Sequence, residues 1–512
     1  MKRTLALVLA LLMLMAIAVG CADSGDTTPD DTTPASSGNQ GDVTPGGDGG
    51  DSGNQGGGDS ADTTPAEVVP EFAEADYNKD EFLVFQRNAN ASSYPGFYID
   101  SEEVTDTMSE AVFVRNLAVE EKYNVVINTL EVGDPYKEIR TYISSGDIPF
   151  DVVLDRRSYM GSLAQEGYFY NFNDLEHVDF SQPYWDSNCA EDYEVAGKLF
   201  FMVNDVSVSN LAGARFFYFN KNLISEYNLQ DPYKLVEKNE WTLDNFLTLV
   251  SSVAVDDGDG VWTGSDTYGL LSETGSSNGN IMHLLVGCDI RLTEKNPSGL
   301  LETNAYTDKT QIIMSKVATV LLESNSCLTY AEAKEGADTA GFANNFDFGR
   351  SLFANDHFLF VQGNMKVSEQ FRDMTSDYGV VPNPKYDAAQ DSYYHKMDKY
   401  SLIWAIPKCT MDYDRVGIIM EYWAYESSKT VMPAYYEITI KTKRVQEETA
   451  SQMIDIVKDS ILYDISEIYS TDVVDALYNG YVSGNLSSTW AASKRVVTRK
   501  LDKIYDDISN LE

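Results

Sequence analysis

Basic side chains are scarce in this 512-residue sequence. The chain has 38 Lys and Arg against 80 Asp and Glu, which gives a formal net charge of -42. No contiguous basic stretch is available to neutralise phosphate groups, so the composition excludes nucleic acid and disfavours polyanionic ligands as partners. We attribute the excess of acid to the solubility of the folded surface.

Cysteine and histidine are also few. The five cysteines are Cys21, Cys189, Cys288, Cys327 and Cys409, and there are four histidines. No CxxC pair and no metal-binding His spacing occurs among them, so zinc-ribbon and thioredoxin-type sites are excluded. Whether Cys189 pairs with Cys409, or Cys288 with Cys327, stays open at this stage.

Long apolar runs are confined to the N-terminus. Lys2 and Arg3 precede an unbroken apolar run over residues 5–19, and Gly20 and Cys21 follow it. This pattern predicts a secretory signal over residues 1–20, too short and wrongly flanked to span a membrane. The segment resembles a lipobox, with Ala18 where the pattern prefers Leu, and the resemblance implies a lipid-anchored Cys21. The alternative is a secreted protein without a lipid.

Residues 21–75 are rich in Gly, Asp, Thr and Pro, and they repeat the words Asp-Thr-Thr-Pro and Gly-Asn-Gln-Gly. Such a composition cannot bury enough apolar surface to offset the entropy of ordering, so a disordered linker is predicted. Anchor and linker together predict an extracytoplasmic protein held at the cell membrane.

The remaining chain is too long for one core and suits two. Strands are predicted at residues 81–86, 124–130 and 150–154, with helices between them, which favours an α/β fold with a mostly parallel sheet. Ligands bind beyond the carboxyl ends of such strands. Asn88, Asp155 and Arg156 follow predicted strands, so they are candidate ligand-binding residues.

An uninterrupted aromatic run at residues 216–219 predicts a strand buried on both faces. The phrase YFNKNLISEYNLQDPY that begins in this run closely resembles the crossover segment of ABC-transporter solute-binding proteins of the carbohydrate class, the maltose-binding-protein-like family. Residues 353–365 and the YGVVPNPK segment at 378–385 carry a second resemblance to that family. The resemblance implies a periplasmic-binding-protein-like fold, with two α/β lobes joined by a hinge and a ligand cleft between them.

The family layout implies the domain boundaries. The first lobe would comprise residues 78–213 with 380–430, the second lobe residues 214–379, and the C-terminal helices 431–512 would pack across both. The layout also brings further residues to the cleft. These candidates are Asp205 near the hinge, Ser277 and Asn278 in a loop, Met365 after a strand, and Tyr435 and Tyr436 as an aromatic platform exposed by Pro433.

The loop at residues 257–266 resembles a calcium-binding loop. Asp257, Asp259 and Asp266 fall at ligand positions of the EF-hand pattern, whereas Val255 occupies its first position. A side chain without oxygen at that position favours a vestigial turn, so no cofactor is expected and calcium is a minor alternative.

One enzymatic pattern is present. Residues 275–279 read Gly-Ser-Ser-Asn-Gly and match G-x-S-x-G, which would make Ser277 the nucleophile of a serine hydrolase if a strand precedes it and a helix follows. No HGGG-type oxyanion segment accompanies it. A surface binding protein without a transporter is a third hypothesis.

The family resemblance decides among these hypotheses. It implies a monomeric, non-enzymatic lipoprotein that captures a carbohydrate, preferably an oligosaccharide, and delivers it to the permease subunits of an ABC importer.

Overall fold

The computed structural model describes residues 70–88, 98–101, 103–335, 341–371, 373–408, 410, 412–440 and 448–511. The predicted signal, most of the predicted linker, Cys21 and Cys409 lie outside these residues. Residues 70–512 form one compact unit. No helix in the described ranges combines the length and apolar character that crossing a membrane requires.

The first sheet contains the predicted N-terminal strands. Its order is β13-β3-β1-β2, and β1 pairs in parallel with both β2 and β3. The strands are β1 (Asp80–Arg87), β2 (Val125–Val132), β3 (Val152–Arg156) and β13 (Leu402–Ala405). All three strands predicted in this region are confirmed, and β13 returns from far along the chain to pair antiparallel with β3.

The second sheet is built around the aromatic run. Its order is β11-β4-β10-β6-β5, with β9 also paired to β6. The strands are β4 (Arg215–Asn220), β5 (Ala254–Val255), β6 (Thr267–Ser272), β9 (Cys327–Thr329), β10 (Phe358–Asn364) and β11 (Tyr378–Val381). Every residue of β4 is buried, as predicted, because β10 and β11 flank it and helices cover it.

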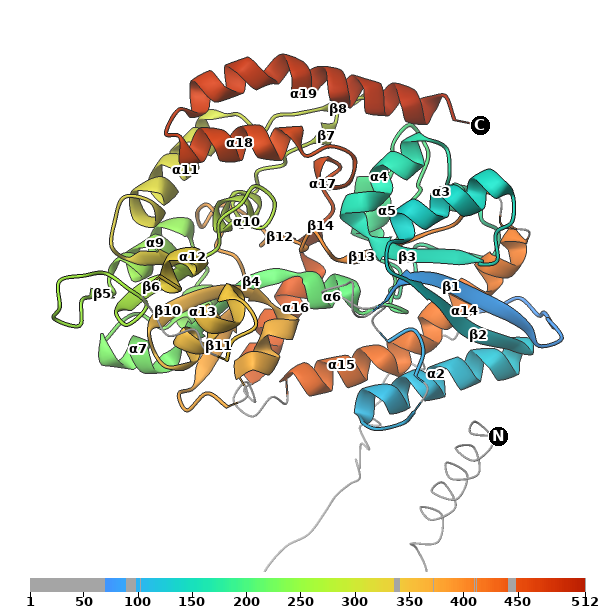
Figure 1. Cartoon of the computed structure of the whole chain (residues 1–512), viewed down its shortest axis with the longest axis horizontal. Helices are drawn as coiled ribbons and strands as arrows, with labels where there is room; N and C mark the ends of the chain where they lie inside the picture. Colours follow the sequence, from blue (N-terminus) through green and yellow to red (C-terminus); the bar gives the residue numbers. More distant parts are fainter. Residues whose placement is uncertain are drawn as a thin grey trace, which may run out of the picture. The chain divides into compact units, whose positions relative to one another are not determined.

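Helices connect and cover both sheets (Figure 1). Those before the second sheet are α2 (Thr107–Tyr123), α3 (Pro135–Ser145), α4 (Arg157–Gln165), η2 (Phe172–Asp174), α5 (Ser187–Tyr193) and α6 (Ser209–Gly213). The helices between β4 and β11 in the sequence are α7 (Lys221–Glu226), α8 (Pro232–Glu237), α9 (Leu243–Ser251), α10 (Asn280–Gly287), α11 (Asp308–Leu321), α12 (Tyr330–Ala333), α13 (Asn345–Ala354) and η3 (Met365–Phe371).

The C-terminal part is mainly helical, and its helices contact elements next to the first sheet as well as elements of and next to the second sheet. It comprises α14 (Tyr413–Lys429), α15 (Val431–Ile440), α16 (Glu448–Asp459), α17 (Ser466–Tyr469), α18 (Asp472–Val482) and α19 (Leu486–Ser509). Helices α14 and α15 pack on α2, and α16 packs on β11. Helix α18 contacts α10 and α11, whereas α17 and α19 contact α4 (Figure 1). Two short sheets, β12 (His395–Lys396) with β14 (Ile461–Leu462) and β7 (Glu294–Lys295) with β8 (Leu301–Glu302), add to these contacts.

The chain passes between the two sheets just before β4 and again before β13. Ala214 and Met397 form an antiparallel bridge at this crossing. A Cβ atom added to Gly213 would lie 1.9 Å from Ser401 Oγ, so glycine permits the close approach of the two segments. The crossing therefore precedes β4, which is an interior strand of the second sheet and not itself the connection.

One predicted boundary is wrong. Residue 380, the predicted return to the first lobe, falls inside β11, which pairs with β4. Lys385 still exchanges backbone hydrogen bonds with the second-sheet region, at Trp241 and Leu243. The return comes after these residues because the Pro-containing stretch that follows β11 stays on the second-sheet side.

Three of the cysteines can be placed. Cys189 and Cys288 are buried free thiols, and Cys327 is a half-buried free thiol. Cys288 and Cys327 are therefore not bridged to each other. Burial raises the pKa of the Cys288 thiol to about 12, which makes it unreactive at neutral pH.

Candidate functional site

The carboxyl ends of β1 and β3 lie side by side, as the parallel pairing requires, and bring Asn88, Asp155 and Arg156 to one edge. Asp155 is fully buried and accepts hydrogen bonds from Arg87 Nε at 2.9 Å and Nη2 at 3.2 Å. Burial raises the pKa of Asp155, and the Arg87 guanidinium opposes that rise. Asp155 therefore holds Arg87 in place and does not itself face a ligand.

Beside this pair lies an aromatic surface that sequence patterns did not reveal. The Arg87 guanidinium lies 5.3 Å from the centre of the Tyr159 ring, and Arg156 lies 4.7 Å from the Tyr400 ring and 5.9 Å from Tyr159. The Tyr159 side chain is 37% exposed, and Tyr400 is half-buried. Two phenol rings thus flank a guanidinium. The rings can stack on apolar ligand faces, and the guanidinium can donate hydrogen bonds to ligand oxygens.

A loop after β6 approaches the same region from the second sheet. Asn278 Nδ2 donates to Asp398 Oδ2 at 3.0 Å, and Asn278 Oδ1 accepts from the Lys399 backbone N at 3.3 Å. Asp398 Oδ1 in turn accepts from the Tyr400 backbone N at 2.9 Å. Segment 398–400 therefore connects Asn278, on the second-sheet side, to the Tyr400 ring beside Arg156.

An ion-pair group lies next to Asn278. Arg215 Nη2 is 2.9 Å from Asp398 Oδ2, and Arg215 Nη1 pairs with Glu273. The three side chains are almost fully buried. We call Asn88, Arg156, Tyr159, Asn278 and Tyr400 the candidate cleft residues; Arg87, Asp155 and this ion-pair group hold them in place.

Four other predicted ligand residues lie elsewhere. Met365 is only 2% exposed, so its side chain is core. Helix α15 continues through Pro433 because proline is tolerated in the first turn of a helix, and the predicted exposure of Tyr435 is wrong: it is 7% exposed and packs against Tyr98.

The half-buried Tyr436 lies within electrostatic range of the buried Asp205. Burial raises the pKa of Tyr436, and the carboxylates of Asp455, Asp459 and Asp205 raise it further. Burial also raises the pKa of Asp205 to about 7, with Lys458 opposing the rise. A protonated carboxyl beside a phenol can exchange hydrogen bonds with a neutral polar ligand. Both stay predictions as ligand residues.

Ser277 has part of the context that a hydrolase requires, since β6 precedes it and α10 follows it. It is separated from β6 by several loop residues, and Gly275, not Ser277, has the left-handed backbone of a sharp turn, with φ 122°. Within the described residues, no histidine makes a hydrogen bond with Ser277. His395 contacts Asn383 and Ser460, and burial lowers its pKa to about 3.

The calcium-like loop is folded by its own backbone. The two oxygens of Asp266 accept from the backbone N of Asp257 and of Thr263, each at 2.7 Å, and Asp266 is buried. Asp266 therefore stabilises the loop rather than facing a cation. The carboxylates that gather are those of Asp256, Asp257 and Asp259, with oxygens within 4.8 Å of one another.

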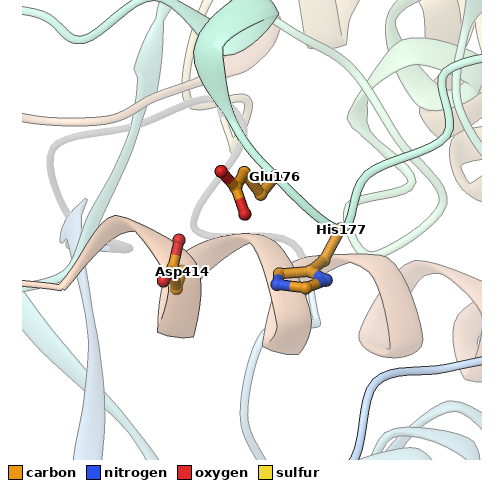
Figure 2. A group of neighbouring side chains, drawn as sticks. All are labelled: Glu176, His177 and Asp414. Carbon is orange, nitrogen blue, oxygen red and sulfur yellow. The ribbon is translucent and has the colours of Figure 1, made fainter.

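A further group of possible metal ligands lies on another surface. Figure 2 shows Glu176 and His177 on one loop beside Asp414 of α14, and their ligand atoms lie within 4.8 Å of one another. All three are exposed. Hydrated carboxylates commonly cluster in this way without an ion, so neither group is by itself a metal site.

The candidate cleft residues that the sequence patterns missed are Tyr159 and Tyr400, and Arg87 lies against the Tyr159 ring. Tyr159 follows Arg156 by three residues and stands in the first turn of α4, where a side chain returns to the strand edge. That spacing was available in the sequence. The approach of Tyr400 to Arg156 could not be read from the sequence, because it depends on the antiparallel pairing of β13 with β3.

Comparison with known proteins rests on structure alone. A scan of the sequence against protein-family models finds no match. A search of the curated proteins finds none either. Solved structures do match.

The sugar-binding protein MalE from Xanthomonas citri aligns with a TM-score of 0.53 and 11% identity over 83% of this chain and 97% of that one. The apo form of RafE from Streptococcus pneumoniae aligns with a TM-score of 0.51 and 14% identity over 85% of this chain and 100% of that one. An ABC substrate-binding protein from Listeria monocytogenes, in complex with cycloalternan, aligns with a TM-score of 0.50 and 11% identity over 85% of this chain and 100% of that one. The chain therefore has their fold, two α/β lobes of the periplasmic-binding-protein type, as predicted.

Proposed function

We propose that this chain is the substrate-binding protein of an ABC importer, capturing a carbohydrate between its two lobes without chemical conversion. The observation that carries the proposal is the placement of Arg156 between the Tyr159 and Tyr400 rings. Asn88 and Asn278 add amide groups from the two sides.

This surface has the chemistry that a sugar requires. A sugar ring presents hydroxyl groups at its edge and C–H groups on its face, so it needs polar planar groups and aromatic faces together. A guanidinium donates to hydroxyl oxygens, and an amide both donates and accepts. A lone amino acid or metal ion would leave the two rings without a role, which favours an oligosaccharide.

The structural neighbours support this choice of ligand. One is described as a sugar-binding protein, and another was solved with the oligosaccharide cycloalternan. They are binding proteins rather than enzymes, which agrees with the Ser277 surroundings. On this proposal the partner is a membrane permease, and closure of the lobes accompanies binding because contacts on both sides form only when the cleft is shut.

Cys21 lies outside the described residues, so the lipid anchor is proposed from the sequence alone. The apolar run before Gly20 and Cys21 supports it. In cells, Cys21→Ser should move the protein from the membrane fraction to the medium. Retention of the variant in the membrane fraction would argue against acylation.

Calorimetry with a panel of mono- and oligosaccharides, including cycloalternan and raffinose, tests the proposed ligand. We expect one or a few members to bind, and small-angle scattering to show compaction with those alone. Tyr400→Ala should abolish the heat of binding, whereas Tyr227→Ala, which removes a half-buried tyrosine at the end of α7, should not. Binding of amino acids or peptides, with no sugar bound, would overturn the carbohydrate assignment but leave the fold unchanged.

A further inference from the structure

Helix α17 of the C-terminal part contacts both α4 and α18 (Figure 1). Its approach to α4 is close, because a Cβ atom added to Gly161 would lie 2.0 Å from the Ile468 carbonyl oxygen. Helix α4 directly follows Arg156 and carries Tyr159 in its first turn. Helix α17 therefore packs on the element that forms the first-sheet side of the candidate cleft.

The buried Glu467 carboxylate of α17 pairs with two cations. Glu467 is 4% exposed, and its oxygens lie 3.2 Å from Arg157 Nη2 and 3.0 Å from Lys396 Nζ. Arg157 is the residue after Arg156, whereas Lys396 belongs to β12. Burial lowers the pKa of Lys396, and Glu467 opposes that fall, so the carboxylate stabilises the buried ammonium group.

The loop that carries Asn278 receives two contacts from this region. Lys396 Nζ donates to the Ser277 carbonyl oxygen, and the Gly275 backbone N donates to Tyr478 Oη of α18 at 2.9 Å. Both contacts are made to the loop backbone just before Asn278. The position of the Asn278 amide therefore depends in part on two side chains that come from outside the second sheet.

The charged side chains behind this arrangement line a different space from the candidate cleft. Arg157, Lys396 and Glu467 all line a cavity of about 510 Å³, and none of the candidate cleft residues lines it. Their own charges are used in the ion pairs among them. An effect of Lys396 on sugar binding must therefore pass through the loop and not through contact with the sugar.

We propose that Lys396 and Tyr478 are positioning residues of the sugar site, which act through Asn278, and that Glu467 holds Lys396 in place. A hydrogen bond weakens steeply when its distance and angle depart from the optimum, so a small shift of the loop costs affinity. The inference rests on the proposed sugar-binding function, and it assigns the support of the second-sheet side of the site to the C-terminal helices.

Hydrogen exchange followed by mass spectrometry on the purified protein tests the positioning without any ligand. Tyr478→Phe keeps the half-buried ring and removes the acceptor of the Gly275 N–H group, so peptides covering residues 275–279 should exchange at least about tenfold faster. Asp472→Asn, which removes the α18 partner of Lys500, is the matched control and should leave this exchange unchanged. Wild-type exchange in Tyr478→Phe would overturn the proposal.

Calorimetry tests the consequence for binding. The probe is the tightest binder of the sugar panel, cycloalternan and raffinose included. Lys396→Met and Tyr478→Phe should each weaken its binding about fivefold or more, because each removes one hydrogen bond that fixes the loop. Asp472→Asn should leave the affinity unchanged. Wild-type affinity in both Lys396→Met and Tyr478→Phe would contradict a positioning role.

A double-variant cycle separates positioning from general support of the fold. Once Asn278→Ala has removed the amide, Lys396→Met should weaken binding by less than about twofold further, and so should Tyr478→Phe, the milder change. Fully additive losses would overturn the proposal. A panel in which no sugar binds would instead refute the proposed function, and the exchange at residues 275–279 would still decide whether α18 positions the loop.

Discussion

The two sheets use the polar residues at their strand ends in opposite ways. At the end of β3, the buried Asp155 is occupied by Arg87, and the pair leaves Tyr159 and Arg156 at the surface. After β6, by contrast, Glu273 and Asp398 both form ion pairs with Arg215, and nearly all of their side-chain surface is buried. The first edge presents a guanidinium and an aromatic ring to a ligand, while the charged residues of the second edge are paired with one another and leave Asn278 as its candidate cleft residue.

The difference shows that a charged residue at a strand end is not by that fact a ligand residue. Whether it binds depends on whether its partner lies within the chain, because an internally paired carboxylate has few acceptor sites left. Each prediction below changes one group on either side of this distinction.

The largest effect should come from the paired charges of the second edge. In Arg215→Met, the carboxylates of Glu273 and Asp398 stay buried without their shared cation, so the free energy of unfolding should fall by about 3–5 kcal/mol. Urea unfolding followed by circular dichroism measures this loss. Arg499→Met on the exposed face of α19 is the matched control and should change stability by less than about 0.5 kcal/mol. A loss as small as that of the control would mean that the ion pairs are not structural.

The second prediction concerns Asp205, whose pKa lies near 7 in the folded protein against an ordinary value of 3.8. Because the folded state holds the proton more tightly, Asp205 lowers stability as pH rises from about 4 to 7 and holds that cost above pH 7. Asp205→Asn removes the titration, so it should raise the free energy of unfolding at pH 8 by about 2–4 kcal/mol and leave it unchanged at pH 3.5.

Urea unfolding of both proteins at several pH values tests the sign as well as the size. Asp502→Asn on the exposed surface of α19 serves as the control and should show no such pH dependence. A variant that is less stable than the wild type at pH 8 would show that the ionised Asp205 carboxylate makes a stabilising contact.

Much of the fold was predictable because it depends on local patterns. The aromatic run of β4 and the apolar strands β1, β2 and β3 are visible in the sequence without any partner strand. The edge that brings Asn88, Asp155 and Arg156 together followed from the rule for parallel strands. Boundary 380 failed because β11 and the Pro-rich stretch after it give no signal of which sheet they join.

The site was only half predictable, since residue type does not specify the partner. Asp155 has the chemistry of a ligand residue, and only the structure shows that Arg87 occupies it. Tyr435 and Met365 were expected at the cleft from the family pattern and are core here. Tyr400 reaches Arg156 through a contact between residues far apart in sequence, which no local pattern encodes.

The first edge should show its effect in binding and not in stability. Tyr159→Ala removes a 37% exposed ring, so the affinity for whichever sugar binds should fall about tenfold or more, while the melting temperature changes little. Calorimetry and thermal unfolding measure the two quantities. Tyr159→Phe keeps the ring and should retain most of the affinity. Equal losses in both variants would shift the role from the ring face to the hydroxyl.

The smallest effect is expected from calcium, at the loop where the same distinction recurs. Asp266 accepts hydrogen bonds from the backbone N of Asp257 and Thr263, which leaves the half-buried Asp256 and the exposed Asp257 and Asp259 as the carboxylates that gather. With no buried oxygen ligand added, any affinity should be at best millimolar, so 1 mM calcium should stabilise the fold by no more than about 0.4 kcal/mol. Thermal unfolding with calcium and with a chelator measures the difference. A clear drop on chelation that Asp257→Asn abolishes would show that these three carboxylates form a true calcium site despite Val255.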